Sequence, residues 1–237
     1  KVFSMKIAFD YSIFSLQKYG GISRYFVRLA NSLKKRGIEV KIFAPRHINS
    51  YVEELDKTIY HGKKITNIPA KMGRFYDLFN IFSSRKLIKN FEADIIHNTY
   101  FPRFSSLMST LPRVVTVHDM IHEKFKSNFG FWDKTSSLKL RAIREADHII
   151  CISNSTKNDL LGLCNLDEEK ISVIHHGYEK SFLFNSEEKK SNQDAPYLLF
   201  VGSRNGYKNF ISFIKDYASD KELMMNFNVI AFGSSDF

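Results

Sequence analysis

A histidine and an aspartate follow an apolar run near the middle of the chain. The run 114–117 is rich in β-branched residues, and His118 and Asp119 come directly after it. In open α/β sheets, ligands bind beyond the carboxyl ends of the strands, so His118 is well placed to contact one. Two interpretations are open: His118 acts on a substrate, or its ring bonds a loop carbonyl while Asp119 caps the next turn. His97, at the end of another predicted strand, has the same two interpretations.

A glycine pair marks the start of the first long predicted helix. Gly20 and Gly21 stand between the first predicted strand and a segment in which apolar residues recur every three or four positions. The unpaired amides and the dipole of a helix N-terminus attract anions, and glycine lets a diphosphate approach closely. The G-x-G-x-x-G pattern is absent, so a simple tight turn is the alternative.

Two cations occur together late in the chain. Arg204 and Lys208 lie in a glycine-containing loop that follows the predicted strand 197–201. Arginine can bind a phosphate with two parallel hydrogen bonds, and lysine can neutralise the charge that grows on a leaving diphosphate. Mg²⁺ performs this task in many phosphate enzymes. The alternative is a solvated basic loop.

The elements that must position these residues alternate in type. Short runs of β-branched and aromatic residues are separated by segments of helical period, which predicts βαβ units and a largely parallel sheet. We expect strands at 6–10, 39–44, 65–68, 94–97, 113–118, 148–152 and 170–175, and then at 197–201 and 228–232. Helices are expected from Gly21 to a stop at Gly37, at 134–146, at 153–163 and at 210–217.

The chain divides at a polar stretch. Residues 1–185 form a complete Rossmann-like domain in this interpretation, 186–196 a linker, and 197–237 the beginning of a second domain. One strand-helix-strand unit is too small to bury its own faces. We therefore expect the second domain to be truncated.

Composition indicates a globular protein of a reducing compartment. Hydrophobic residues make up 43% of the chain, and there is no apolar run of about 18 residues that could span a bilayer. Met5 is a candidate native start, and no secretory signal precedes it. The two cysteines, Cys151 and Cys164, lack metal-binding spacing and predict buried thiols. We expect a cytoplasmic protein.

The positive charge is concentrated before the linker. The chain has a net charge of +10, and residues 1–185 carry 29 Lys and Arg against 18 Asp and Glu. Such a field favours phosphates, nucleic acid or an anionic membrane surface. The segment 71–89 combines aromatic and basic residues, which fits either a membrane-surface helix or a core helix with a wet basic face. No RNA- or DNA-binding signature accompanies it, so we expect no nucleic acid partner.

Six motifs in order resemble glycosyltransferase family 4, which has the GT-B fold. They cover almost the whole chain and are GGISRYF, ADIIHNTYF, VVTVHDMIHEKF, READHIICISNSTKNDL, KISVIHHGYEKSF and LLFVGSRNGYKNF. The resemblance implies two Rossmann-like domains facing across a cleft, the first binding acceptor and the second a nucleotide sugar. It also implies transfer with retention of configuration and without a metal or other cofactor.

The resemblance also assigns roles. It implies that Gly20 and Gly21 contact the donor diphosphate, that His118 lies by the transferring sugar, and that Arg204 and Lys208 hold the phosphates. Two features depart from the family. The sequence His-His-Gly at 175–177 replaces the usual Asn-Gly, and the chain ends before the expected paired glutamates of the donor site.

The function that follows is a hexosyltransferase of surface polysaccharide or lipopolysaccharide assembly. GDP-mannose is the expected donor and a glycan or lipid-linked molecule the acceptor, with the protein at the inner face of the cell membrane. The alternative is a noncatalytic lobe that binds the acceptor or a partner transferase. A Rossmann oxidoreductase is disfavoured because the dinucleotide fingerprint is not evident.

Overall fold

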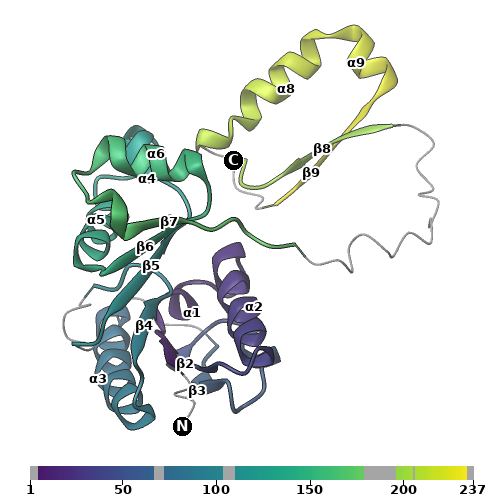
Figure 1. The fold of residues 1–237 in the computed structure, drawn as a ribbon. Helices are drawn as coiled ribbons and strands as arrows, with labels where there is room; N and C mark the ends of the chain where they lie inside the picture. The colour runs from purple at the N-terminus through teal and green to yellow at the C-terminus, as the bar shows by residue number, and fades with distance from the viewer. Residues whose placement is uncertain (1–4, 67–71, 104–109, 179–195, 205, 234–237) are drawn as a thin grey trace. The chain divides into compact units, whose positions relative to one another are not determined.

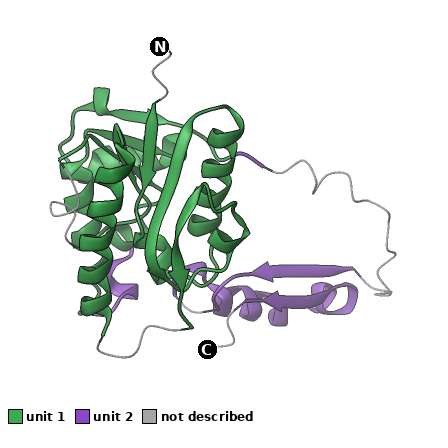
Figure 2. Ribbon diagram, turned by 90° about the horizontal axis from the view of Figure 1, so that it is seen from below, with its two compact units in different colours: residues 1–124, 132–176 green, residues 125–131, 177–237 purple. Residues whose placement is uncertain are grey.

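The computed structural model describes residues 5–66, 72–103, 110–178, 196–204 and 206–233 (Figure 1). The chain forms two compact units, which Figure 2 distinguishes by colour. The first contains residues 1–124 and 132–176, and the second contains 125–131 and 177–237. The predicted linker 186–196 falls almost entirely outside the described residues.

The first unit is built on a seven-stranded sheet in which every neighbouring pair is parallel. The strand order is β3-β2-β1-β4-β5-β6-β7, so the direction of progression reverses between β1 and β4. The predicted α/β class with a parallel sheet is confirmed. The strands are β1 (Lys6–Phe9), β2 (Glu39–His47), β3 (Tyr60–Lys64), β4 (Ile95–Asn98), β5 (Arg113–Val117), β6 (His148–Cys151) and β7 (Ile171–Val173).

The third strand lies earlier in the chain than the sequence predicts. The expected strand at 65–68 is wrong for Ile65 and Thr66, which follow the end of β3, and residues 67 and 68 lie outside the described residues. The reason is the pairing with β2, which shifts register between Ala44 and Arg46 opposite Gly62. A Cβ at Gly62 would stand 1.9 Å from the Ala44 carbonyl oxygen, so the bulge requires glycine there.

Helices cover both faces of this sheet, as right-handed crossovers between parallel strands require. In Figure 1, α2 lies on one side of the sheet and α3 on the other. The α2 helix is followed by Gly37 at φ +79°, and Ser153 Oγ accepts the Thr156 amide to cap α6, as predicted. The helices are α1 (Ser12–Leu16), α2 (Gly21–Lys35), α3 (Gly73–Phe91), α4 (Ile121–Lys124), α5 (Thr135–Glu145) and α6 (Asn154–Leu163), with 3₁₀ turns at Tyr51–Glu54, Lys126–Asn128 and Glu168–Lys170.

The core of the first unit lies in two apolar clusters. One is centred on Phe9, Phe14 and Phe26 and joins α2 and α3 to β1, β2 and β4. The other packs α5 and α6 against β5 and β6 and includes the thiol of Cys151. Burial raises the pKa of Cys151 to about 11, so this cysteine is a neutral packing residue.

The second unit contains β8 (Tyr197–Val201), α8 (Phe210–Ser219), α9 (Lys221–Asn226) and β9 (Asn228–Phe232). A 3₁₀ turn at Gly206–Lys208 precedes α8. The two strands pair in parallel, and α8 packs its Phe210 against Phe200 of β8. The predicted strand-helix-strand unit is therefore present, with α9 as an additional short helix that the sequence analysis did not predict.

Candidate functional site

The N-terminus of α2 is held by the loop that precedes it. Gly20 is the N-cap residue, and Gln17 Oε1 accepts the amide of Ser23 at 3.3 Å. The Ser23 hydroxyl donates back to the Gly20 carbonyl at 3.1 Å. A Cβ at Gly20 would stand 2.2 Å from Gln17 Oε1, whereas one at Gly21 would meet nothing within 4 Å. Gly20 therefore makes room for the Gln17 side chain, which takes the Ser23 amide, and the space at Gly21 allows an anion to approach the amides that precede Ser23.

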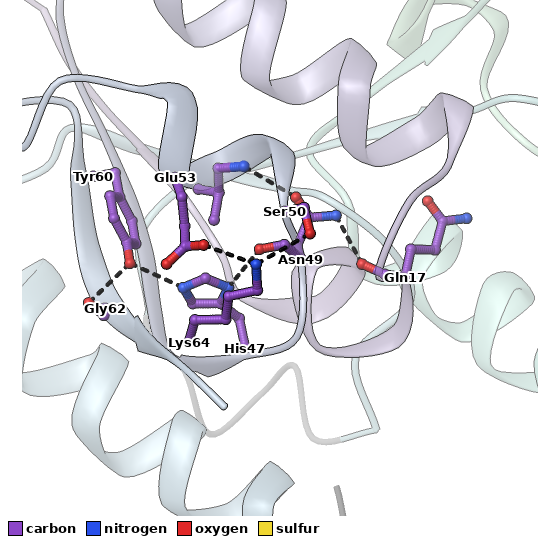
Figure 3. Close-up of polar contacts among 9 residues, drawn as sticks. Gln17, His47, Asn49, Ser50, Glu53, Tyr60, Gly62 and Lys64 are labelled. Carbon is purple, nitrogen blue, oxygen red and sulfur yellow. Dashed lines mark hydrogen bonds and ion pairs between the residues drawn. The ribbon is translucent and has the colours of Figure 1, made fainter. Parts of the chain in front are cut away.

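A polar network connects this loop to the end of β2 (Figure 3). Asn49 donates to the Gln17 carbonyl at 2.7 Å, and His47 contacts the Asn49 carbonyl and the Tyr60 hydroxyl at 3.2 and 2.9 Å. Burial lowers the pKa of His47 to about 4, so its ring is neutral near pH 7. The network is fully occupied by internal bonds. It acts as a support for the turn before Gly20 rather than as a site of chemistry.

His118 lies one residue beyond β5, at the carboxyl edge of the sheet. Its ring meets those of Tyr25 and Phe26 on α2, with centroid separations of 5.4 and 6.4 Å. His118 Nε2 is buried and has no hydrogen-bond partner among the described residues. Burial and then the neighbouring His176 lower the pKa of His118 to about 4. The result is a neutral imidazole whose Nε2 atom makes no hydrogen bond to the described residues.

Two residues that the sequence analysis did not assign to the site surround this imidazole. Tyr25 lies one helical turn after Gly21, and its ring stacks on that of His176 at 4.7 Å and 11°. The His176 ring also meets His118 edge-on at 5.4 Å. The available signals were the helical spacing from Gly21 to Tyr25 and the His-His-Gly departure from the family pattern. Neither indicates which residues pack together.

The other candidate on a strand end, His97, is a structural residue. Its Nε2 is 2.9 Å from Thr116 Oγ1, and its ring packs against Phe9 and Phe26. Burial lowers the pKa of His97 to about 3. The side chain of Thr116 also hydrogen-bonds the Tyr25 hydroxyl, so Thr116 links His97 to Tyr25.

The loop after His118 is fastened by a buried ion pair. Lys139 donates to Glu123 at 2.8 Å and to the Asp119 carbonyl at 2.9 Å, and both side chains of the pair are 3% exposed. Asp119 Oδ1 accepts the Ile121 amide at 3.0 Å. Asp119 is therefore the cap of the following turn, which was one of its two interpretations.

A pocket of about 280 Å³ opens at the same edge of the sheet, between the loops that follow β1 and β4. This is the point where the strand order reverses, which is where open α/β sheets bind ligands. Aromatic and acidic side chains share the lining: Tyr11, Tyr100 and Trp132 with Asp77 and Asp133.

Some polar groups of this pocket have hydrogen-bond or ion-pair partners, whereas the hydroxyl of Ser12 has none among the described residues. Arg103 pairs with Asp77 at 3.4 Å, and burial raises the pKa of Asp77 above its usual value. Ser12 Oγ lines the pocket and has no hydrogen-bond partner among the described residues. Beneath the loops, the buried carboxylate of Asp10 accepts from Thr99 and Asn98 and so joins the ends of β1 and β4.

Arg204 and Lys208 belong to the second unit. The Arg204 guanidinium lies 5.9 Å from the Phe210 ring at the start of α8. Lys208 crosses Gly202, where a Cβ would stand 2.4 Å from its Nζ atom. Gly202 has φ +140°, so it provides both the backbone conformation and the space for the lysine. The geometry brings these two cations to one loop, and their role stays a prediction.

The chemistry of the first unit is thus concentrated at the carboxyl edge of its sheet. The structure brings His118 to the first turns of the helix that Gly20 and Gly21 begin. An open helix N-terminus can bind a phosphate, a neutral imidazole can orient a hydroxyl, and an aromatic pocket can hold a sugar ring.

Comparison with known proteins shows the family of the chain. The family model described as Glycosyltransferase Family 4 matches residues 19–182. The O-antigen chain mannosyltransferase RfbU of Salmonella typhimurium is 24% identical over 205 residues, which is 83% of this chain and 54% of that protein. The chain therefore spans about half the length of this curated relative.

Solved structures share the fold. A glycosyltransferase from Rickettsia africae is 20% identical with a TM-score of 0.59, and the match covers 99% of this chain and 69% of that one. The lipopolysaccharide outer core galactosyltransferase WaaB is 13% identical with a TM-score of 0.57, with 98% and 69% covered. At these identities the similarity supports the GT-B fold alone.

Proposed function

Since the chain belongs to glycosyltransferase family 4, we propose that it transfers mannose from GDP-mannose to a glycan or lipid-linked acceptor in surface polysaccharide assembly. The observation that carries the transfer chemistry is the His118 imidazole, half-buried and neutral beside the helix that Gly20 and Gly21 begin. The choice of mannose rests on the name of the Salmonella relative, a mannosyltransferase, and on the sequence GYKNF at 206–210, which resembles that of mannosyl- and rhamnosyl-transferring relatives.

The proposed reaction retains configuration and takes place on one face of the sugar. The acceptor oxygen bonds the anomeric carbon as the bond from that carbon to the diphosphate breaks, and a departing phosphate oxygen takes the acceptor proton. A pKa of about 4 makes His118 a poor base at pH 7. Its role is instead to orient the reacting groups by a hydrogen bond from its ring.

The donor phosphates require fixed positive groups in a reaction that proceeds without a metal. We assign this task to the amides at Gly20 and Gly21 and to Arg204 and Lys208. The acceptor sugar is assigned to the pocket at the β1–β4 reversal. Tyr100 and Trp132 provide faces for its apolar side, and Asp77 and Asp133 accept from its hydroxyls.

The test is incorporation of labelled sugar into a lipid extract of the organism that encodes the chain. GDP-mannose, UDP-galactose and dTDP-rhamnose are supplied in parallel, and the anomer of the product is determined by NMR. We expect label from GDP-mannose only, with retained configuration. In a full-length enzyme, Lys208→Ala should lower kcat/KM by about ten- to a thousandfold. The control is Lys221→Ala, because Lys221 is an exposed lysine of the same unit.

Three results would contradict parts of this proposal. Label from another donor would refute the mannose assignment, and equal kinetics of the Lys208 and Lys221 variants would remove the loop from the mechanism. If the protein binds a component of the lipid extract but transfers sugar from none of the donors, the second candidate is favoured. That candidate is a noncatalytic lobe that holds the acceptor or a partner transferase. That candidate is favoured by the pocket, whose lining residues all belong to the first unit.

A further inference from the structure

Helix α3 has an apolar stripe on each of two sides. Its inner side packs on β2, where Ile81 and Ile88 are buried, Asn80 bonds the Arg46 amide and carbonyl, and Ser84 Oγ donates to the Phe43 carbonyl. The helix is therefore anchored to the sheet through this side. An ordinary surface helix would present only polar residues on the other side.

The other side carries four large apolar side chains instead. Phe75, Leu78, Phe79 and Phe82 recur at i, i+3, i+4 and i+7, and they are 62%, 38%, 39% and 61% exposed. The interpretation of this segment as a core helix with a wet basic face holds for the inner side of α3, but these four apolar side chains lie outside the core. The reason is that Asn80, Ile81, Ser84 and Ile88 already occupy the side that faces the sheet.

The same stripe continues with cations. Arg85, Lys86 and Lys89 follow Phe82 at i+3, i+4 and i+7, and all three are exposed. We call residues 75, 78, 79, 82, 85, 86 and 89 the outer stripe. It contains no acidic residue. Its first half is apolar and its second half is basic, on one continuous side of the helix.

We propose that the outer stripe docks on an anionic lipid bilayer. Helices that lie in a membrane interface place phenylalanine and leucine among the acyl chains and lysine and arginine at the headgroups, and the outer stripe offers both. The four apolar residues span about 10 Å of helix, enough for the first half of α3 to enter the interface. No helix among the described residues is long and apolar enough to cross a membrane.

A nucleic acid fits the outer stripe less well. Single strands are bound in basic grooves that follow the backbone, with aromatic side chains between successive bases. Here three phenylalanines lie next to one another on a convex helix, and the cations lie beyond them rather than along both sides. The apolar and the charged residues are thus separated along the helix, just as acyl chains and charged headgroups are separated in a bilayer.

The experiment is sedimentation of the protein with vesicles, which does not depend on sugar transfer. We expect binding to phosphatidylcholine vesicles that contain phosphatidylglycerol, weak binding to phosphatidylcholine alone, and release as salt rises. Each cation at the surface contributes about 1 kcal/mol, so neutralising two should weaken the partition coefficient about 30-fold. The variant is Arg85→Gln with Lys86→Gln.

A matched control separates the outer stripe from net charge. Lys34→Gln with Lys35→Gln removes the same charge from exposed positions at the end of α2, and should change the partition coefficient far less. Phe75→Ser with Phe82→Ser should also weaken binding, although the charge is unchanged. Far-UV circular dichroism identical to that of the parent shows that each variant is folded.

Insertion can be observed directly because the chain contains one tryptophan, Trp132. In Phe82→Trp with Trp132→Phe, the emission of the new tryptophan should shift to shorter wavelength on anionic vesicles. The proposal is overturned by equal binding to both lipids, by equal effects of the two glutamine pairs, or by an unshifted emission. Displacement by a single-stranded oligonucleotide at equal charge concentration, with unshifted emission, would identify a nucleic acid site instead.

Discussion

The buried pair Lys139–Glu123 predicts a large stability difference between two lysines in ion pairs of equal length. Lys139 and Lys124 each lie 2.8 Å from a carboxylate oxygen, but Lys139 is 3% exposed and Lys124 is 46% exposed. Replacing Lys139 with methionine leaves the Glu123 carboxylate buried without its cation. Breaking a buried pair from one side costs about 3–5 kcal/mol, whereas an exposed pair contributes about 0–1 kcal/mol.

The assay is urea unfolding followed by far-UV circular dichroism. Lys139→Met should lower the free energy of unfolding by about 3–5 kcal/mol, including about 1 kcal/mol for the hydrogen bond to the Asp119 carbonyl. Lys124→Met should lower it by less than about 1 kcal/mol. The second variant, Lys139→Met with Glu123→Leu, removes both charges and should recover most of the loss.

Two results would refute this reasoning. The first is a cost for Lys139→Met no larger than that for Lys124→Met, which would mean that the pair is solvated in solution. The second is a double variant as unstable as the single one. In that case the loss would come from packing or from the Asp119 carbonyl, not from an uncompensated carboxylate.

Two further predictions concern backbone space and pH. Gly233 has φ +148°, and a Cβ there would stand 2.1 Å from the Gly202 carbonyl oxygen, so Gly233→Ala should destabilise the β8–β9 pair by about 1–3 kcal/mol. Hydrogen exchange at β8 and β9 measures this, with Gly162→Ala as the control because its Cβ would meet nothing within 4 Å; equal exchange in both variants would contradict the prediction. For His118, the unfolded ring takes up a proton near pH 6.5 but the folded ring only near pH 4, because burial lowers its pKa. The unfolded state therefore binds more protons in this window, and stability falls as the pH drops from about 6.5 to about 4. Between pH 7 and pH 5, the urea concentration at the midpoint of unfolding should fall less in His118→Gln than in the parent. An equal decrease in both would show that the ring is solvated.

Much of the first unit follows from local patterns. Consecutive β-branched residues such as 114–117 suit a strand buried on both faces, and the apolar spacing after Gly21 suits a helix that packs on a sheet. These patterns also place His118 at a strand end and the glycine pair at a helix start, because both positions depend only on neighbours in sequence. The ordered motifs identified the family for the same reason.

Some details were decided by contacts that local patterns do not contain. The position of β3 depended on a bulge in which Gly62 approaches the Ala44 carbonyl, and sequence spacing alone suggested a later strand. The neutral state of His118 depends on Tyr25 and His176, which are far from it in sequence and meet it only after folding.

Helix α3 shows the same division most directly. That the segment is helical, aromatic and basic follows from its composition and its apolar period. It could not determine which side of the helix faces the sheet, since apolar residues occur on both. Contacts with the sheet set the orientation of the helix, because the hydrogen bonds of Asn80 and Ser84 to β2 turn Ile81 and Ile88 inward. Because a helix can turn only one side toward the sheet, Phe75, Phe79 and Phe82 on the opposite side are exposed.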